Sequence, residues 1–120
     1  SMSPTIVTDA DGELQLVLGS PGGARIIPFV LQTLVAHLDW GLDIQQAITL
    51  PRHVTIGGPV EIERGSPLAA RAEALRAFGH VVAENDLVSG LQGISVRRDG
   101  EARRLVGGAD PRREGDAAGD

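Results

Sequence analysis

The chain has 120 residues, and its fractions of 42% hydrophobic and 22% charged residues are typical of one ordinary globular domain. Its formal net charge is −5 and its arginines are scattered among acidic residues, which argues against a protein that binds nucleic acid. No apolar run approaches the roughly 20 residues that a membrane span requires. Without cysteine the chain forms no disulfide and performs no thiolate chemistry, but this does not fix its cellular compartment.

The N-terminal residues predict a β-hairpin. Residues 5–8 are all β-branched, as is typical of a strand. Leu14, Leu16 and Leu18 alternate along a second strand that has one buried face. The sequence Asp9-Ala10-Asp11-Gly12 between the two strands predicts the turn, because glycine adopts positive φ without strain.

A glycine-rich loop, Gly19-Ser20-Pro21-Gly22-Gly23, follows the second strand and leads into a predicted helix. The helix is indicated by apolar residues at helical spacing, namely Ile27, Val30, Leu31, Leu34, Val35 and Leu38. Pro28 suits its first turn and Gly41 ends it. Because this helix is apolar on most sides, we expect it to lie centrally in the fold.

A short second helix is predicted after Asp43. Asp43 and Gln46 form a capping-box pattern, and Pro51 stops the helix. Its inward face consists of Ile44, Ala47 and Ile48. Residues 52–58 are expected to form a loop or a ragged strand.

The second half of the chain predicts further short elements. Val60–Glu63 alternates as a half-exposed strand, and Ser66-Pro67 predicts a helix start with serine as the cap. This helix has the inward face Leu68, Ala72 and Leu75, and it ends at Gly79. A short strand is predicted at Val81-Val82. A hairpin follows, with strands at Ile94–Val96 and Leu105-Val106 and a turn at Asp99-Gly100. Residues 107–120 are too polar to pack much. The sum is an α+β fold with about three helices and an antiparallel sheet.

The glycine loop is the one candidate site that the pattern offers. A glycine turn between a strand and a helix leaves backbone N–H groups unpaired at the positive end of the helix dipole. Such a place binds an anion, or a carbonyl oxygen that becomes negative during a reaction. The alternative interpretation is a tight strand-to-helix connection that binds nothing.

Other polar residues give weaker indications. The histidines at positions 37, 53 and 80 lack metal-ligand spacing, and His37 on an apolar helix is better explained as a packing residue. The serines at 20, 89 and 95 lack the Gly-x-Ser-x-Gly pattern of hydrolases. Glu61, Glu63 and Glu73 are expected to lie on solvated faces.

Several stretches in matching order resemble the C-terminal half of the small subunit of γ-glutamyltransferases (γ-glutamyl transpeptidases). They are Ser1-Met2-Ser3-Pro4-Thr5-Ile6-Val7, Gly19-Ser20-Pro21-Gly22-Gly23-Ala24-Arg25-Ile26-Ile27, and Gln45-Gln46-Ala47 leading to Pro51-Arg52. The similarity continues through Ser66-Pro67, Gly79-His80-Val81-Val82 and Asp110-Pro111-Arg112. It is weakest at residues 54–60, and in the segment 89–93 only Gln92 matches the family's Thr-Gln-Ser well.

The resemblance implies membership of the N-terminal-nucleophile hydrolases, whose fold is a four-layer αββα sandwich. In that family a precursor cleaves itself, and the newly exposed threonine attacks the γ-glutamyl amide of glutathione and similar compounds. The glutamyl group then passes to water, an amino acid or a peptide. Carried over, Gly22 and Gly23 would stabilise the oxyanion by their backbone N–H groups, while Ser1-Met2 would help to bind the substrate's α-carboxylate. No metal or other cofactor is implied.

The resemblance also implies that this chain is one part of an enzyme. We expect residues 1–106 to form a partial small-subunit domain and 107–120 a polar C-terminal tail. The family's nucleophilic threonine, the acidic residue that binds the substrate's α-amino group and the arginine that pairs with its carboxylate lie in segments that this chain does not include. We therefore expect the isolated chain to be inactive. Its expected partners are the remainder of the small subunit, the large subunit and a γ-glutamyl substrate such as glutathione.

Two alternatives stay open. Ser1 could itself be an N-terminal nucleophile with its own α-amine as base. The chain could instead be a non-catalytic, truncated or split module, which associates with itself or another chain because its apolar sheet edges and helix faces are uncovered.

Overall fold

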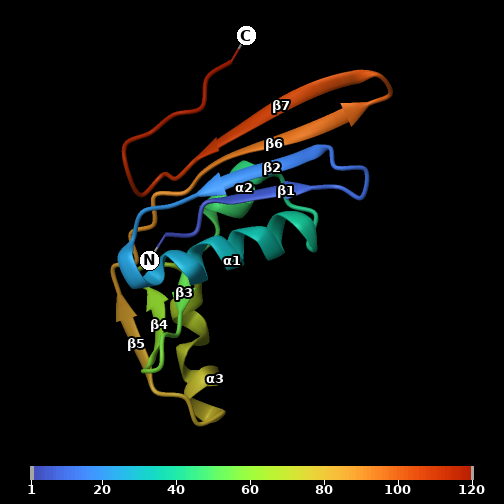
Figure 1. Cartoon of the computed structure of the whole chain (residues 1–120). Helices are drawn as coiled ribbons and strands as arrows, with labels where there is room; N and C mark the ends of the chain where they lie inside the picture. The colour runs from blue at the N-terminus through green and yellow to red at the C-terminus, as the bar shows by residue number, and fades with distance from the viewer. Residues whose placement is uncertain (1, 120) are drawn as a thin grey trace.

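A four-stranded antiparallel sheet forms the main layer of the computed structural model, which describes residues 2–119 (Figure 1). Its strands, in spatial order, are β1 (Thr5–Thr8), β2 (Leu14–Gly19), β6 (Gln92–Asp99) and β7 (Ala102–Ala109). Both predicted hairpins are confirmed, since β1 pairs with β2 and β6 pairs with β7. Gly12 and Gly100 in their turns have φ values of 81° and 64°, which glycine adopts without strain.

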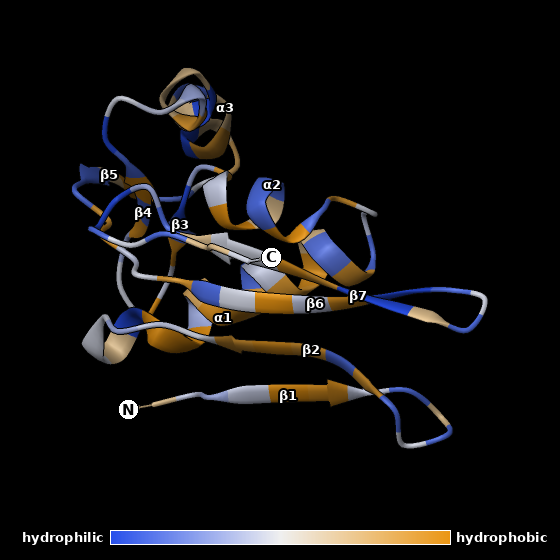
Figure 2. Cartoon of the chain, turned by 90° about the horizontal axis from the view of Figure 1, so that it is seen from above, coloured by the Kyte–Doolittle hydropathy of each residue, from blue (hydrophilic) through white to orange (hydrophobic). Residues whose placement is uncertain are grey.

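Two helices cover one face of this sheet: α1 (Ile26–Leu38) and α2 (Ile44–Thr49). The main core lies between helices and sheet, and its buried members are Leu16, Leu18, Ile26, Phe29, Val30, Ile44, Ile48, Val54, Leu87 and Leu91. Figure 2 shows β2 and much of α1 in apolar colours, whereas the far end of the β6–β7 hairpin is hydrophilic. The core is therefore nearly all aliphatic.

Helix α1 is not buried all round, contrary to the expectation of a central helix. One side carries the buried residues Phe29 and Val30. On the other side Ile27, Leu31 and Leu38 are 55%, 58% and 51% exposed. The apolar residues on most sides of the helix thus include a stripe that nothing in the described part of the chain covers.

Helix α2 begins with the predicted capping box. The Gln46 N–H donates to the Asp43 carboxylate at 2.7 Å, and the Asp43 N–H donates to the Gln46 side chain at 3.1 Å. The helix ends at Thr49, and Leu50 before Pro51 is extended, as the residue before proline prefers.

The side chain of Gln45 on α2 pairs with the backbone of Ala109 at the end of β7. Its amide nitrogen donates to the Ala109 carbonyl, and its amide oxygen accepts from the Ala109 N–H, both at 2.9 Å. A Cβ on the neighbouring Gly108 would come within 2.9 Å of Ile48, so α2 lies directly against β7. The glutamine therefore occupies the place of a neighbouring strand at this sheet edge.

A second, three-stranded sheet lies beyond one end of α1 (Figure 1). Its order is β3 (His53–Val54), β4 (Val60–Glu63) and β5 (Val82–Asn85). Strand β4 pairs antiparallel with β3 but parallel with β5, and the 3₁₀ helix η2 (Pro67–Arg71) and α3 (Ala72–Ala77) connect the parallel pair. The parallel pairing was not predicted, because nothing in either short strand specifies its partner's direction.

The helix start at Ser66-Pro67 is confirmed, but the role of Ser66 is different. The hydroxyl of Ser66 donates to the Glu63 carbonyl at 2.7 Å and caps nothing, and the first turn is a 3₁₀ helix. Leu68, Ala72 and Leu75 form the predicted inward face, and they pack in a small core with Ile62 and Val82.

The expectation that residues from 107 onward pack little is wrong for residues 108–110, which are buried. β7 continues to Ala109, and Asp110 is 1% exposed. Farther on, a Cβ on Gly107 would come within 2.8 Å of the Ala117 Cβ, so the last residues return alongside β7. The division of the chain at residue 106 stays a prediction.

Candidate active-site loop

The glycine loop enters the first helix through a short 3₁₀ turn, η1 (Gly23–Arg25). Gly22 precedes this turn with φ 142° and ψ 11°, and Gly23 has φ 62°. A Cβ on Gly22 would lie 3.1 Å from the Phe29 ring, whereas a Cβ on Gly23 would meet no atom within 4 Å. The backbone conformation therefore favours glycine at both positions, and close packing adds a second reason at Gly22.

One side of the loop is attached to the segment before β6. The hydroxyl of Ser20 accepts a hydrogen bond from the Gly90 N–H at 3.1 Å and donates to the Pro21 carbonyl at 2.7 Å. A Cβ on Gly90 would lie 2.7 Å from the Pro21 ring. Gly90 therefore has no room for a side chain beside the loop.

The other side of the loop is attached to the second sheet. Arg25 ends η1, and its guanidinium donates two hydrogen bonds to the Glu61 carboxylate, from Nε at 3.1 Å and from Nη2 at 2.7 Å. Asn85 donates a third at 2.7 Å. Hydrogen bonding by Arg25 is the main cause that lowers the pKa of Glu61, and the same pairing raises the pKa of Arg25.

The expectation that Glu61 and Glu63 lie on solvated faces is therefore wrong. Glu61 is 7% exposed, and Glu63 pairs with Arg112. Neither ion pair could be read from the sequence, because Arg25 and Glu61 are 36 residues apart, and Glu63 and Arg112 are 49 apart.

A cluster of buried polar groups surrounds Asp110, the residue after β7, and includes part of the segment before β6. Asp110 accepts hydrogen bonds from the Ser89 hydroxyl, from the Leu91 N–H at 3.0 Å, and from the backbone and guanidinium of Arg112 at 3.1 and 3.0 Å. Arg52 is 0% exposed and donates to the Ser89 hydroxyl at 3.1 Å and to the Ile48 carbonyl. The cluster joins α2 to the end of β7 and to the segment before β6, and the pairing of Arg112 with Glu63 extends it to β4 of the second sheet.

Charge effects within this cluster are strong. Burial, aided by the nearby Arg112, lowers the pKa of Arg52 to about 10. Burial alone would raise the pKa of Asp110, but the hydrogen bonds from Ser89, Leu91 and Arg112 outweigh it and lower that pKa. Burial likewise opposes the charge of Arg112, but Glu63 and Asp110 outweigh it and raise the pKa of Arg112.

Comparison with known proteins identifies the family. The model of the gamma-glutamyltranspeptidase family matches residues 1–120. The chain belongs to this family. It is 44% identical over 115 residues to a glutathione hydrolase proenzyme of Escherichia coli (strain K12), a match that covers 93% of this chain and 19% of that protein. It is 36% identical over 121 residues to the corresponding proenzyme of Bacillus subtilis (strain 168), covering 99% of this chain and 20% of that protein.

Solved structures of gamma-glutamyltranspeptidases have the same fold. The T380A mutant of the Helicobacter pylori gamma-glutamyltranspeptidase superposes with a TM-score of 0.87 at 31% identity, covering 94% of this chain and 61% of that chain. The chain thus has the α+β fold of an N-terminal-nucleophile hydrolase and belongs to a family of enzymes. It spans about a fifth of the length of the curated relatives named above.

Within this gamma-glutamyltranspeptidase fold, the predicted site residues are only partly described. Gly22 and Gly23 lie together at the helix start, as predicted, and Met2 is 85% exposed. Ser1, the predicted carboxylate-binding residue and alternative nucleophile, lies outside the described residues. Their roles stay predictions. Sequence reasoning missed the Arg25–Glu61 pair, although Arg25 lies inside the family motif.

His37 has a polar partner at each of its two ring nitrogens. His37 contacts the Leu42 carbonyl at 2.8 Å and the Ser95 hydroxyl at 3.1 Å, which confirms it as a satisfied packing residue. No group of three or more potential metal ligands occurs in residues 2–119.

The longest helix, α1, has 13 residues, and no described helix has the length and apolarity of a membrane span.

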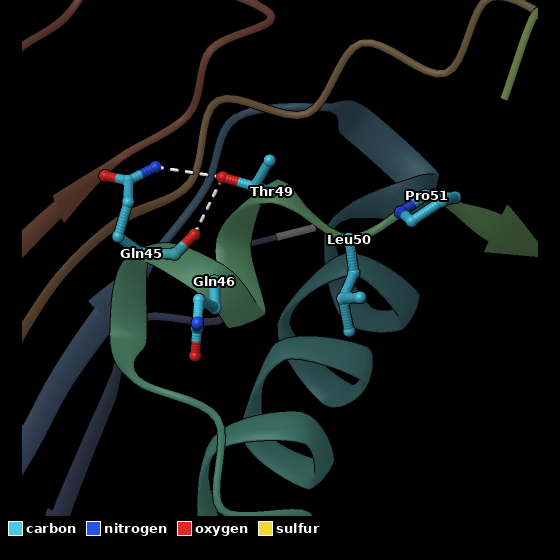
Figure 3. Close-up of a pocket in the computed structure, with 5 residues that line it drawn as sticks. All are labelled: Gln45, Gln46, Thr49, Leu50 and Pro51. Atoms are coloured by element: carbon cyan, nitrogen blue, oxygen red, sulfur yellow. Dashed lines mark hydrogen bonds between the residues drawn. The ribbon is translucent and has the colours of Figure 1, made fainter. Parts of the chain in front are cut away.

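An open pocket of about 380 Å³ lies on α2 and the turn after it, lined by Gln45, Gln46, Thr49, Leu50 and Pro51 (Figure 3). A second, of about 480 Å³, lies at the end of the smaller sheet between residues 55–60 and 79–81. Figure 3 shows Gln45 turned toward Thr49, to which its amide donates at 3.0 Å. Neither pocket includes the glycine loop.

Proposed function

We propose that the chain is the C-terminal portion of the small subunit of a gamma-glutamyltransferase. The complete enzyme transfers the γ-glutamyl group of glutathione or a related compound to water, an amino acid or a peptide. The main support is the 44% identity to a glutathione hydrolase proenzyme of which this chain spans about a fifth. The specific contribution of the chain is the glycine loop at the start of α1.

The loop acts on the oxygen of the substrate's γ-carbonyl. When the nucleophile bonds to the carbonyl carbon, the π electrons move to the oxygen, which becomes negatively charged. The backbone N–H groups of Gly22 and Gly23 then stabilise this oxyanion, each contributing about 3 kcal/mol to a lower barrier. When the tetrahedral intermediate collapses, the bond to the leaving amine breaks and the glutamyl group stays on the nucleophile as an ester. The amine takes the proton that the threonine hydroxyl had given to the α-amine. Glycine suits these positions because it lets the backbone approach the substrate closely.

The other parts of the site come from outside this chain. The threonine nucleophile, with its own α-amine as base, and the groups that bind the substrate's amino acid moiety belong to the preceding small-subunit segment and the large subunit. Ser1-Met2 contributes to binding of the α-carboxylate. The isolated chain is therefore inactive.

The test is a hybrid in which residues 1–120 replace the matching segment of the Escherichia coli relative. We expect the hybrid to release p-nitroaniline from γ-glutamyl-p-nitroanilide and the isolated chain to release none. Gly23→Ala keeps the N–H but disfavours the φ of 62°, and the misdirected donor should lower kcat of the hybrid by up to about 10²-fold. Gly12→Ala is the matched control, because Gly12 also has positive φ and open space but lies in the remote β1–β2 turn. Equal effects of the two variants, a folded but inactive hybrid, or turnover by the isolated chain would refute the proposal.

Exposed apolar surface favours the second candidate, a non-catalytic module that associates with itself or another chain. Ile6, Val17 and Ile94 are paired neighbours across three strands and are 70%, 39% and 48% exposed on the sheet face opposite α1. Light scattering of the isolated chain at high concentration tests this function. A dimer that Ile94→Thr dissociates would support it, and a monomer would argue against it.

A further inference from the structure

No side-chain cap fixes the start of the helices that follow the glycine loop. Neither η1 nor α1 has a side-chain hydrogen bond at its N-cap, so the usual means of fixing a helix start is missing. Pro21, Gly23 and Ala24 are exposed, and two successive glycines give the backbone wide freedom. An oxyanion site requires N–H groups held in one orientation before the charge develops. Contacts outside the loop can therefore contribute to this orientation, and two of them are the Gly90 N–H bound to Ser20 and the Arg25–Glu61 pair.

The contact on the second sheet has the geometry for this role. Arg25 lies two residues after Gly23, and its guanidinium is held by both oxygens of Glu61. Such a bidentate pair fixes direction as well as distance. Glu61 is in turn fixed by the Asn85 amide and by its place in β4, the central strand of its sheet.

We infer that Glu61 is a positioning residue for the glycine loop and acts through Arg25. The pair attaches the start of α1 to the second sheet and thereby holds Gly22 and Gly23 at one angle to the substrate. Glu61 itself does not touch the substrate. The effect on loop order concerns this chain alone, and only its catalytic consequence rests on the proposed function.

A purely stabilising ion pair would behave differently. Arg25→Lys keeps the positive charge but replaces the planar two-donor contact with a single ammonium group. If charge alone mattered, lysine would preserve loop order, whereas a positioning role requires the bidentate contact. Glu61→Gln keeps the size of the side chain but offers one acceptor in place of two.

The primary experiment measures ¹⁵N relaxation order parameters in the 120-residue chain. In the wild type we expect about 0.85 at Gly22 and Gly23, as in rigid backbone, and values below about 0.6 in Glu61→Gln and Arg25→Lys. The control is Glu13→Gln, which neutralises an exposed carboxylate near the β1–β2 turn that accepts a single hydrogen bond from Arg98, at 3.1 Å. Order parameters of β6 and β7 should not change in any variant.

Unchanged loop order in Glu61→Gln, or full order in Arg25→Lys, would overturn the inference. The hybrid enzyme provides the second measurement: Glu61→Gln should lower kcat about tenfold and leave KM within twofold. If the loop loosens but kcat does not fall, Glu61 orders the loop without affecting catalysis, and the positioning role is refuted. Failure of the proposed function is recognised separately, because Gly23→Ala would then leave the hybrid's activity unchanged.

Discussion

Replacement of Asp110 by asparagine tests the energetic role of the buried cluster. Asp110 is 1% exposed, and the groups of residues 2–119 that bond to its carboxylate are all donors: the Ser89 hydroxyl, the Leu91 N–H and two groups of Arg112. Asparagine puts an NH₂ group opposite two of these donors and removes one of the two carboxylates, Asp110 and Glu63, that compensate Arg112. Removing one partner of a buried ion pair costs about 3–5 kcal/mol. That is a large share of the roughly 5–15 kcal/mol that stabilises a typical domain.

Urea unfolding followed by circular dichroism measures this change. With a slope of about 1–3 kcal/mol/M for a small protein, the midpoint should fall by about 2 M. The control is Asp116→Asn, because Asp116 is exposed and its carboxylate accepts from the adjacent Ala117 N–H, at 2.8 Å. A loss of less than 1 kcal/mol at Asp110, or an equal loss at Asp116, would refute the account of the cluster.

The pH dependence gives an independent check on the same residue. The pKa of Asp110 is lower in the folded chain than its ordinary value. Its charge therefore adds stability at pH values above about 3.9, the value for an unfolded chain, and this stability is lost as the pH falls through the folded pKa. The difference between wild type and Asp110→Asn should shrink between pH 7 and pH 3. A constant difference would contradict the lowered pKa.

Two further substitutions test local features. Gly22→Ala forces a side chain into φ 142° and within 3.1 Å of the Phe29 ring, so we expect a loss of about 1–3 kcal/mol in urea unfolding; no loss would mean that the loop adapts freely. Asp43→Ala removes the cap of α2 and should cost about 1 kcal/mol, or a few degrees in Tm by calorimetry. Gln46→Ala removes only the reciprocal half of the capping box, and it should cost less; a larger loss would contradict the assigned roles.

Elements whose determinants are close in sequence could be predicted. Asp43 and Gln46 are three residues apart, and the Asp99-Gly100 turn carries its own conformational preference. The glycine loop was predicted for the same reason, since all its residues are consecutive. The parallel β4–β5 pairing was missed because each strand is four residues long and its partner is chosen by the packing of Ile62, Ala72 and Val82.

Charged residues were misplaced because their burial depends on distant partners. Glu61 on β4 has the sequence context of a solvated strand residue, and only the fold brings Arg25 and Asn85 to it. Asp110 likewise lies in a polar run and is buried because Ser89 and Leu91 donate to it. A buried charge is visible in sequence only when its partner is local, and here the partners come from other elements.

The pairing of Gln45 with Ala109 has a consequence for how the sheet can be extended. Strand β7 is one edge of its sheet, and edges invite backbone pairing with other chains. At Ala109 both the N–H and the carbonyl are already engaged by a side-chain amide, so an incoming strand must break two hydrogen bonds to bind there. Growth of the sheet across the opposite edge, β1, carries no such cost from Gln45. Oligomers or aggregates built by edge-to-edge pairing should therefore form through β1 first.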